Sequence, residues 1–492
     1  MRDGEQTPGV SISPEQKFQI ALKLDELGID VIEAGFPAVS RGETLAIRNI
    51  IKQGLRAEVC GLARAIKPDL DAAINSDLNY IHTFIATSDI HMNYKLKMTR
   101  EEVLEKAVSA VEYSKKHGIQ VEFSAEDATR SDRSFLNRVL KAVARAGVDR
   151  IDIPDTVGYA TPESTRELLI EVIQHTGLPT SVHCHDDFGL AVANSISGIV
   201  AGAECAHVTI NGLGERAGNA SLEEFVMALQ CLYGRKHNVK TELLYETSKF
   251  VANITGVIVQ PNKAIIGENA FGHESGIHTH GILNNPLTYE PISPELVGRK
   301  RWLQAGKHAG AHGINAMLEG FGIKPSQTEL LVIVSRQKSL ADVGKSVSTT
   351  DLLSIAADVM QNSKFEEKFK LYDFHIVTGM NIIPTAVVRL NNDGKDLIAS
   401  EIGVGPVDAA LKAIQKIARE MANIRIREYK LESITGGSDA LAEVSVKVED
   451  KNGGVVSSRK AGEDVVVASV QAMMDAVNKV MLQKVLHSKS QN

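Results

Sequence analysis

The sequence contains few cysteines, and none of them belongs to a paired motif. Cys60, Cys184, Cys205 and Cys231 are scattered over 492 residues without a CxxC pair. This usage excludes a disulfide framework of the kind that staples small secreted domains, and it is typical of a reducing compartment. We therefore expect a cytoplasmic protein whose thiols are free.

Long hydrophobic runs are also missing. The sequence has no run of about 18 apolar residues, the length that a membrane-spanning helix needs. Its start, MRDGEQTPGV, lacks the apolar core of a signal peptide. The net charge of −7 gives no excess of positive charge to attract nucleic acid or an anionic membrane. We expect neither as a partner.

The composition that is present fits a globular protein with more than one core. A chain of 492 residues is too long for one ordinary core, so we expect two or three domains. Hydrophobic residues make up 43% and charged residues 23% of the chain, which is typical of globular domains.

Short β-rich runs alternate with amphipathic helical stretches through the first half of the chain. Alternating strands and helices build a parallel sheet, and the pattern predicts a (βα)8 TIM barrel that lacks its first strand. The alternative is a seven-stranded or open α/β sheet. The predicted strands are Asp30–Phe36, Glu58–Arg64, Tyr80–Ala86, Gln120–Ala125, Arg150–Pro154, Thr180–His185 and Ala206–Asn211.

The missing strand should come first in the chain. The stretch RDGEQTPG is typical of a loop that leaves a strand, yet it follows directly on Met1. We expect either a real truncation or a start codon placed too late. In the second case the chain as written should bind metal and turn over poorly, and a version extended by one strand should not.

The rest of the chain predicts two further parts. Residues 1–255 form the expected barrel, and 256–365 a helical linker region that contacts a partner, with the charged stretch QNSKFEEKFK at its end. Residues 366–492 contain an internal repeat of two βββα units, whose helices should run from Val407 to about Met421 and from Val465 to about Val485. We expect this α+β domain to serve as a dimerisation platform, an effector site, or both.

Polar residues collect where the predicted strands end. The active site of a TIM barrel lies at the carboxyl ends of its strands, so these residues should converge on one mouth. The set consists of Asp3, Arg64, His82, Ser124, Glu126, Asp152, Thr156, His183, His185 and Asn219.

The stretch TSVHCHDD contains the clearest candidate for a metal site. Side chains alternate along a strand, so His183 and His185 should point to one side and Cys184 to the other. Two surface histidines near a turn are the simpler alternative. With Asp3 and Asn219 the set supplies nitrogen and oxygen ligands, which suit Zn²⁺, Mn²⁺ or Mg²⁺ acting as a Lewis acid.

Other polar residues predict the chemistry around that ion. Arg2 could stabilise a developing alkoxide, and Glu126, His82 and His278 are candidates for acid–base work. The residues alone indicate metal-assisted carbon–carbon chemistry or hydrolysis of an oxo acid. Farther along, His273, His278 and His280 could form a second metal cluster, cap helices or reach a neighbouring active site.

The glycine-rich stretch NGLGERAGNA does not predict a dinucleotide site. It follows the last strand, and no acidic residue lies about 20 positions beyond it, as the dinucleotide fingerprint requires. Its glycines more simply shape a loop that presents Asn219.

Long motifs in order along the chain resemble a known family. They are RDGEQTPG, HTFIATS, VEFSAEDATRSD, IDIPDTVGYATP, SVHCHDD, NGLGERAGNASLEE and NAFGHESGIH. Together they resemble the α-isopropylmalate synthase family, part of the superfamily of HMG-CoA-lyase-like barrels. The resemblance covers nearly the whole chain.

The resemblance implies roles for individual residues. Asp3, His183, His185 and Asn219 match the ligands of a divalent metal ion, and Arg2 matches the arginine that holds the oxo group. Thr156 matches a threonine that binds the substrate carboxylate. Glu126 matches the acidic partner of a catalytic histidine, His278, which the partner subunit delivers together with Tyr289. The pocket for the side chain of the oxo acid is implied to include His82, Ser124, Asp152 and Pro154.

The C-terminal repeat resembles the family's leucine-binding regulatory domain. The residues implied to lie near the effector are Gly405, Pro406, Gly436, Gly437, Asp439 and Ala440. A homodimer with leucine as effector follows from this resemblance.

The implied reaction condenses acetyl-CoA with 2-oxoisovalerate and then hydrolyses the thioester, giving 2-isopropylmalate and CoA. Citramalate synthase, which uses pyruvate, is the nearest alternative, because one pocket methyl difference is worth only about 1–3 kcal/mol and a few residues decide. Homocitrate synthase is disfavoured, since Asp3 stands where those enzymes usually have Glu. A catalytically inactive leucine-binding regulator remains open because Arg2 and Asp3 lie at the chain terminus.

Overall fold

A computed structural model describes residues 1–306, 308–342, 347, 349–360, 369–392, 394–422, 424–433, 442–450 and 455–489. The chain splits into two compact units. The first comprises Met1–Gly272 and Glu290–Arg301, and the second comprises His273–Tyr289 and Trp302–Asn492.

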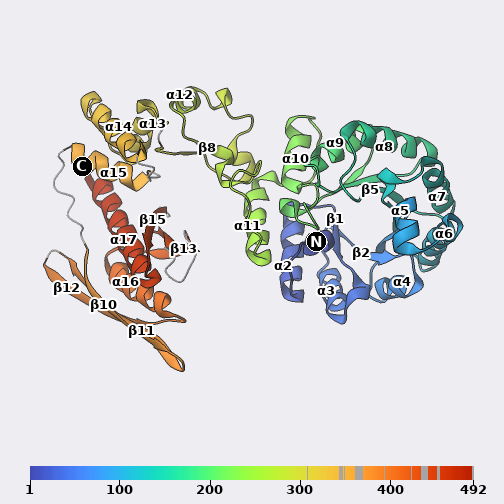
Figure 1. Ribbon diagram of the computed structural model, residues 1–492, viewed down its shortest axis with the longest axis horizontal. Coiled ribbons are helices and arrows are strands. Elements are labelled where there is room, and N and C mark those ends of the chain that lie inside the picture. The colour runs from blue at the N-terminus through green and yellow to red at the C-terminus, as the bar shows by residue number, and fades with distance from the viewer. Residues whose placement is uncertain are drawn as a thin grey trace. The chain divides into compact units, whose positions relative to one another are not determined.

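The first unit is built on a sheet of seven parallel strands that follow one another in chain order. Figure 1 shows helices on the outside of this sheet, as a βα barrel requires. The barrel-type parallel sheet and its seven strands confirm the prediction from the sequence. The strands are β1 (Val31–Gly35), β2 (Glu58–Arg64), β3 (Tyr80–Ala86), β4 (Gln120–Glu126), β5 (Arg150–Asp155), β6 (Thr180–Cys184) and β7 (Cys205–His207).

The helices of this unit begin and end at recognisable capping residues. Ser13 and Thr99 each form a capping box with the residue three positions later, and Gly28 and Gly177 end helices in the left-handed conformation. The helices are α1 (Arg2–Glu5), α2 (Pro14–Leu27), α3 (Arg41–Lys52), α4 (Lys67–Ile74), α5 (Asp89–His91), α6 (Arg100–Lys116), α7 (Arg133–Arg145), α8 (Pro162–Thr176), α9 (Ala191–Ala201), α10 (Leu222–Cys231) and α11 (Leu244–Thr255).

Short helical turns complete the unit. A π-helix, η2 (Met92–Leu96), follows α5 directly, and the remaining turns are 3₁₀-helices. The latter are η1 (Pro37–Val39), η3 (Ala128–Arg130), η4 (Ile210–Gly212), η5 (Thr241–Leu243), η6 (Glu268–Phe271) and η8 (Pro294–Val297).

Strand β7 is shorter than the predicted run Ala206–Asn211. The backbone leaves the sheet after His207 and turns through η4, where Asn211 has a φ of 61°. The backbone of Thr209 bonds instead to Ala220 and Leu222, so the apolar run continues as the frame of a loop. The sequence pattern could not separate these cases, because a buried loop and a buried strand are both apolar here.

A cavity of about 1080 Å³ lies between the first and last strands of the sheet. Its walls include Val31 and Ile32 of β1, Ala206 of β7, Leu24 of α2 and Phe225 of α10. Among the described residues no strand pairs with the outer edge of β1 or of β7. The cavity therefore lies where an eighth barrel strand would close the sheet.

The second unit contains the predicted pair of βββα repeats. Strands β10 (Lys370–Gly379), β11 (Ile382–Asn392) and β12 (Lys395–Ile402) precede α16 (Pro406–Ala422), and β13 (Arg425–Ser433), β14 (Ala442–Glu449) and β15 (Val455–Gly462) precede α17 (Val465–Lys489). Each repeat forms its own antiparallel three-stranded sheet. Both helices pack on the sheets (Figure 1). Alternate residues Val444, Val446 and Val448 of β14 enter the shared core.

Shorter elements precede these repeats. They are α12 (Gly276–Asn284), η7 (Pro286–Thr288), α13 (Ala311–Gly320), α14 (Gln327–Asp342) and α15 (Thr349–Val359), and the two-residue strands β8 (Gly272–His273) and β9 (Trp302–Leu303). Most of the predicted linker stretch 361–370 lies outside the described residues. The division at 255 and 365 stays a prediction.

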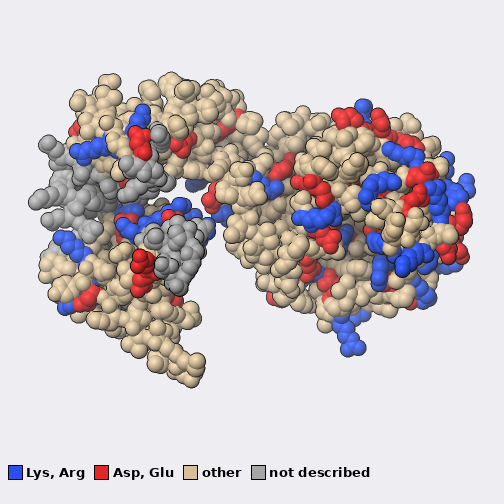
Figure 2. Space-filling view, viewed as in Figure 1, with Lys and Arg blue, Asp and Glu red and all other residues tan. Residues whose placement is uncertain are grey.

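Charges of both signs are interleaved on the visible face of the first unit (Figure 2). Ion pairs such as Arg100 with Asp89 and Arg138 with Glu101 account for part of this pattern. Within the described part of the chain, no helix combines the length and the hydropathy that crossing a membrane requires.

Candidate active site

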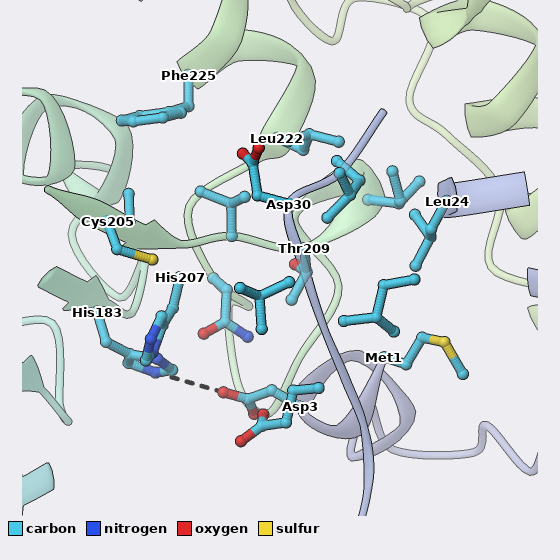
Figure 3. Close-up of a pocket in the computed structure, with 18 of the residues that line it drawn as sticks. Met1, Asp3, Leu24, Asp30, His183, Cys205, His207, Thr209, Leu222 and Phe225 are labelled. Atoms are coloured by element: carbon cyan, nitrogen blue, oxygen red, sulfur yellow. Dashed lines mark ion pairs between the residues drawn. The ribbon is translucent and has the colours of Figure 1, made fainter. Parts of the chain in front are cut away.

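Asp3, His183 and His185 meet at the mouth of the barrel. The Asp3 Oδ2 atom lies 3.3 Å from His183 Nε2 and 3.9 Å from His185 Nε2, and the two imidazole nitrogens are 3.2 Å apart. All three side chains are buried, and Figure 3 shows Asp3 facing His183. One ligand atom from each lies close enough to the others to hold a single ion.

Asn219 completes this donor set. The glycine-rich loop that carries it follows β7, and a backbone bridge joins Asn219 to His185. Its side-chain NH2 donates to the Leu213 carbonyl at 3.0 Å, which leaves the buried Oδ1 atom without a hydrogen-bond partner. A buried amide oxygen without a partner is costly unless a ligand satisfies it. The loop thus presents Asn219, as the sequence predicted.

The protonation states suit a cation. Burial lowers the pKa of His183 well below its usual range and also lowers that of His185, so both rings are neutral at pH 7. Burial alone would raise the pKa of Asp3, but the charge of the neighbouring Arg2 guanidinium acts in the opposite direction and the pKa is lowered. Two neutral imidazoles, a carboxylate and an amide oxygen are a donor set that fits a divalent metal ion.

Arg2 is fixed by a carboxylate that the sequence reasoning missed. The guanidinium Nε donates to Glu33 Oε2 at 2.8 Å, and Glu33 Oε1 lies 2.7 Å from His82 Nδ1. Burial acts to raise the pKa of Glu33, but Arg2 and His82 hold it well below its usual range. The signal was present in the sequence, because Glu33 interrupts an otherwise apolar strand.

His82 continues this chain of contacts across the sheet. Its Nε2 atom lies 2.6 Å from Ser124 Oγ, and that hydroxyl donates to Asp152. Strands β4 and β5 place Ser124 and Asp152 in register with each other. The structure therefore brings together three of the four predicted pocket residues. Pro154 lies in register with His183 on the neighbouring strand.

A second buried cluster below these residues was also missed. His207 Nε2 lies 3.2 Å from Glu122 Oε1, and His207 Nδ1 lies 3.7 Å from Asp152 Oδ1. Burial opposes the charge on His207, but Asp152 and Glu122 raise its pKa well above the usual range. Tyr80 and Ser181 donate hydroxyl protons to Glu122. Within this ionic cluster the buried Asp152 Oδ1 atom has no hydrogen-bond partner, and one atom each of Glu122, Asp152 and His207 lie close enough together to hold an ion.

Glu126 and Thr156 lie at the ends of β4 and β5. Glu126 pairs with Lys95 of the π-helix at 2.5 Å. The Thr156 hydroxyl accepts the Asp127 N–H at 2.9 Å, and the Thr156 carbonyl accepts from Arg216. Arg64 does not join the site, because its guanidinium pairs with Asp69 and is more than half exposed.

His278 and Tyr289 belong to the second unit. Their rings contact each other with centroids 4.2 Å apart, and Tyr289 is exposed. His280 instead contacts His312, and His273 bonds through its carbonyl to Gln304. Among the described residues, these histidines do not form a second metal cluster.

The predicted effector residues are only partly described. Gly405 and Pro406 lie where the chain turns from β12 into α16. Gly436, Gly437, Asp439 and Ala440 lie outside the described residues.

Three family models match consecutive parts of the chain. The HMGL-like model matches residues 1–251, the homocitrate synthase post-HMGL domain-like model 265–345, and the LeuA allosteric (dimerisation) domain model 346–481. The first match covers the barrel and its candidate metal site. The models define an HMGL-like enzyme with an added allosteric domain.

Curated relatives define the family more narrowly. The chain is 53% identical to a probable 2-isopropylmalate synthase of Methanopyrus kandleri, over 98% of this chain and 97% of the relative. It is 52% identical to the 2-isopropylmalate synthase of Methanocaldococcus jannaschii, over 98% and 94%, and 49% identical to the (R)-citramalate synthase of that organism, over 98% of each. The chain belongs to the α-isopropylmalate synthase family of acyltransferases.

Proposed function

We propose that this enzyme is a 2-isopropylmalate synthase, which joins acetyl-CoA to 2-oxoisovalerate and releases (2S)-2-isopropylmalate and CoA. The observation that carries the proposal is the donor set of Asp3, His183, His185 and Asn219, with Arg2 beside it, at the mouth of a barrel. A divalent ion held there supplies Lewis-acid chemistry toward a carbonyl. On this proposal the enzyme catalyses the first committed step of leucine synthesis.

The protein side chains orient the acceptor and stabilise the charge that develops on it. Arg2 keeps its proton, because Glu33 raises its pKa against the effect of burial, and it can donate to the oxygen of the C2 carbonyl. Thr156 is the proposed partner of the carboxylate of the oxo acid. The proposed wall for the isopropyl group consists of His82, Ser124, Asp152 and Pro154.

The proposed base is the pair His278 and Glu126. One of them takes a proton from the methyl group of acetyl-CoA, and the resulting enolate attacks C2 of the oxo acid. Water then hydrolyses the thioester, which makes the overall reaction irreversible. We propose that His278 and Tyr289 act on the barrel of a partner subunit, so the working enzyme is a homodimer.

Regulation by leucine forms part of the proposal. The match to an allosteric domain model at residues 346–481 supports an effector site there, and Gly405 and Pro406 are its described candidates. We also place the enzyme in the cytoplasm, because its four free thiols fit a reducing compartment.

Citramalate synthase is the second candidate. The identities to named citramalate synthases, 49% and 50%, are nearly as high as those to isopropylmalate synthases. The two acceptors differ by an isopropyl against a methyl group, which a few pocket contacts can distinguish.

The test is CoA release from acetyl-CoA, followed with a thiol reagent, with 2-oxoisovalerate, pyruvate and 2-oxoglutarate in parallel. We expect turnover with 2-oxoisovalerate that a chelator abolishes and added divalent ion restores. The Asp3→Asn variant should be inactive with all three acceptors. Metal-restored turnover with pyruvate alone would make the enzyme a citramalate synthase. Wild-type silence with all three, together with leucine binding, would support the inactive regulator.

A further inference from the structure

Lys17 is a buried lysine that joins three elements beside the candidate metal site. It lies on α2 and is 1% exposed, which places it among the largest fully buried side chains. Its Nζ atom lies 2.6 Å from Glu5 Oε2 and 2.6 Å from Glu43 Oε1. Glu5 ends helix α1, and Glu43 belongs to the first turn of α3.

Stability alone does not explain such a residue. Lysine is almost never fully buried without a partner, because removing its charge from water is costly. A buried ion pair recovers little of that cost, and apolar residues of similar size often stabilise the same site equally well. What the ion pairs at Lys17 do provide is a fixed geometry between the groups that they join.

Glu43 is the fixed end of this arrangement. The Phe36 N–H donates to Glu43 Oε1 at 3.0 Å, and Ser40 Oγ accepts the Glu43 N–H at 3.1 Å. A Cβ atom on Gly35 would lie 1.9 Å from Glu43 Oε1, so only glycine at the end of β1 leaves room for this carboxylate. Because Lys17 pairs with both Glu43 and Glu5, it fixes the position of Glu5 relative to the end of β1.

Helix α1 depends on such outside contacts. It has only four residues and no side-chain hydrogen bond at its N-cap, and a single helical turn is not stable by itself. Arg2 is held at one end by Glu33, and Glu5 is held at the other end by Lys17. Asp3, the carboxylate of the metal site, lies between these two anchors.

We propose that Lys17 is a positioning residue for the metal site, which sets the place of Asp3 through Glu5. The inference rests on the proposed metal-dependent function. It adds a residue whose ammonium pairs with Glu5 and Glu43, neither of which is a candidate metal ligand or a proposed pocket residue.

The test measures metal affinity without substrate. Purified wild type and Lys17→Met are stripped with a chelator and titrated with Mn²⁺ or Zn²⁺ against a chromophoric competitor. Residues that orient metal ligands typically contribute 10–100-fold to affinity, so we expect a rise in Kd of about 10–100-fold. Lys17→Arg, which keeps the charge, should recover part of this loss.

Lys23 provides a matched control on the same helix. Its ammonium also pairs with two carboxylates, Glu26 at 2.9 Å and Glu246 at 2.6 Å, but these do not reach α1. Lys23→Met should leave the metal Kd unchanged. Equal Kd shifts in Lys17→Met and Lys23→Met would overturn the proposal.

Glu5→Gln tests whether Lys17 acts on Asp3 through Glu5. It also keeps the proposal testable if the Lys17 variant fails to fold. The Glu5 side chain is 25% exposed, and its loss spares the pair between Lys17 and Glu43. We expect Glu5→Gln to raise the metal Kd about as much as Lys17→Met. A folded Glu5→Gln with wild-type affinity would contradict the inference and leave the proposed reaction intact. Wild type without metal affinity would overturn both.

Discussion

Glu33 connects Arg2, the proposed donor to the C2 carbonyl, with His82 of the proposed side-chain pocket. One carboxylate oxygen accepts from Arg2 and the other contacts His82. The residue thus orients the guanidinium beside Asp3 and fixes which nitrogen of His82 faces Ser124. Groups that orient a site in this way are second only to the ligands themselves in their effect on activity.

Replacing Glu33 by glutamine should therefore reduce turnover without unfolding the protein. The amide presents one oxygen instead of two, so either Arg2 or His82 loses its acceptor. We expect kcat/KM to fall by about 10–100-fold. The control is Glu58→Gln, an exposed position at the start of β2, which should retain wild-type kinetics. Equal kinetics in both variants would show that Glu33 has no such role.

The lowered pKa of Glu33 also predicts a pH dependence of stability. In the folded protein the Glu33 carboxylate stays ionised to a lower pH than a glutamate of the unfolded chain, whose pKa is about 4.3. The contribution of Glu33 to the free energy of unfolding is therefore complete above about pH 4.3. It is lost as the pH falls further, through the lower pKa that Glu33 has in the folded protein. Urea unfolding should show a difference between wild type and Glu33→Gln that is constant from about pH 6 to 8 and shrinks below about pH 4.3. A difference that grows in acid would contradict this assignment.

At the scale of elements, the sequence predicted most of the fold because its patterns are local. Apolar runs such as Thr180–Cys184 and capping residues such as Ser13 are visible without knowledge of the fold. Polar residues at strand ends then predicted a candidate metal site, since parallel strands place their carboxyl ends together. Glu33 and His207 were not predicted because they contact residues far away in the sequence: Glu33 contacts His82 of β3, and His207 contacts residues of β4 and β5.

Because no described strand pairs with the outer edges of β1 and β7, we expect an added strand to stabilise the barrel. An extended, β-branched segment fused to the N-terminus, ahead of Met1, would enter the cavity between these strands and pair with the two edges that no described strand occupies. We expect a rise in Tm of at least about 4 °C, since 1 kcal/mol shifts the Tm of a domain of this size by about 2–4 °C. Amide exchange in Val31–Gly35 and Cys205–His207 should slow as well.

A glycine–serine segment of equal length is the control for that experiment. It adds the same number of residues but cannot fill the cavity with apolar side chains. The same Tm and the same exchange rates for both extended proteins would mean that the cavity does not accept a strand. Faster turnover of the strand-extended protein would further show that closing the sheet steadies Arg2 and Asp3.

At the scale of the whole molecule, the proposal divides one active site between two subunits. Mixing Asp3→Ala with His278→Ala and allowing subunit exchange should recover about a quarter of wild-type activity, since half the dimers are mixed and each has one intact site. Mixing Asp3→Ala with His183→Ala, which both damage the barrel, should recover none. No recovery in the first mixture, with exchange verified, would place His278 in the site of its own chain.

On the proposed function, the barrel mouth accepts 2-oxoisovalerate in preference to pyruvate. The most direct measurement is a competition in one tube, with equal concentrations of both oxo acids, limiting acetyl-CoA and mass spectrometry of the products. The product ratio gives the ratio of the two kcat/KM values directly. We predict at least about tenfold more 2-isopropylmalate than citramalate, within the range that one or two pocket methyl groups provide. An excess of citramalate would overturn the proposed function and identify pyruvate as the acceptor.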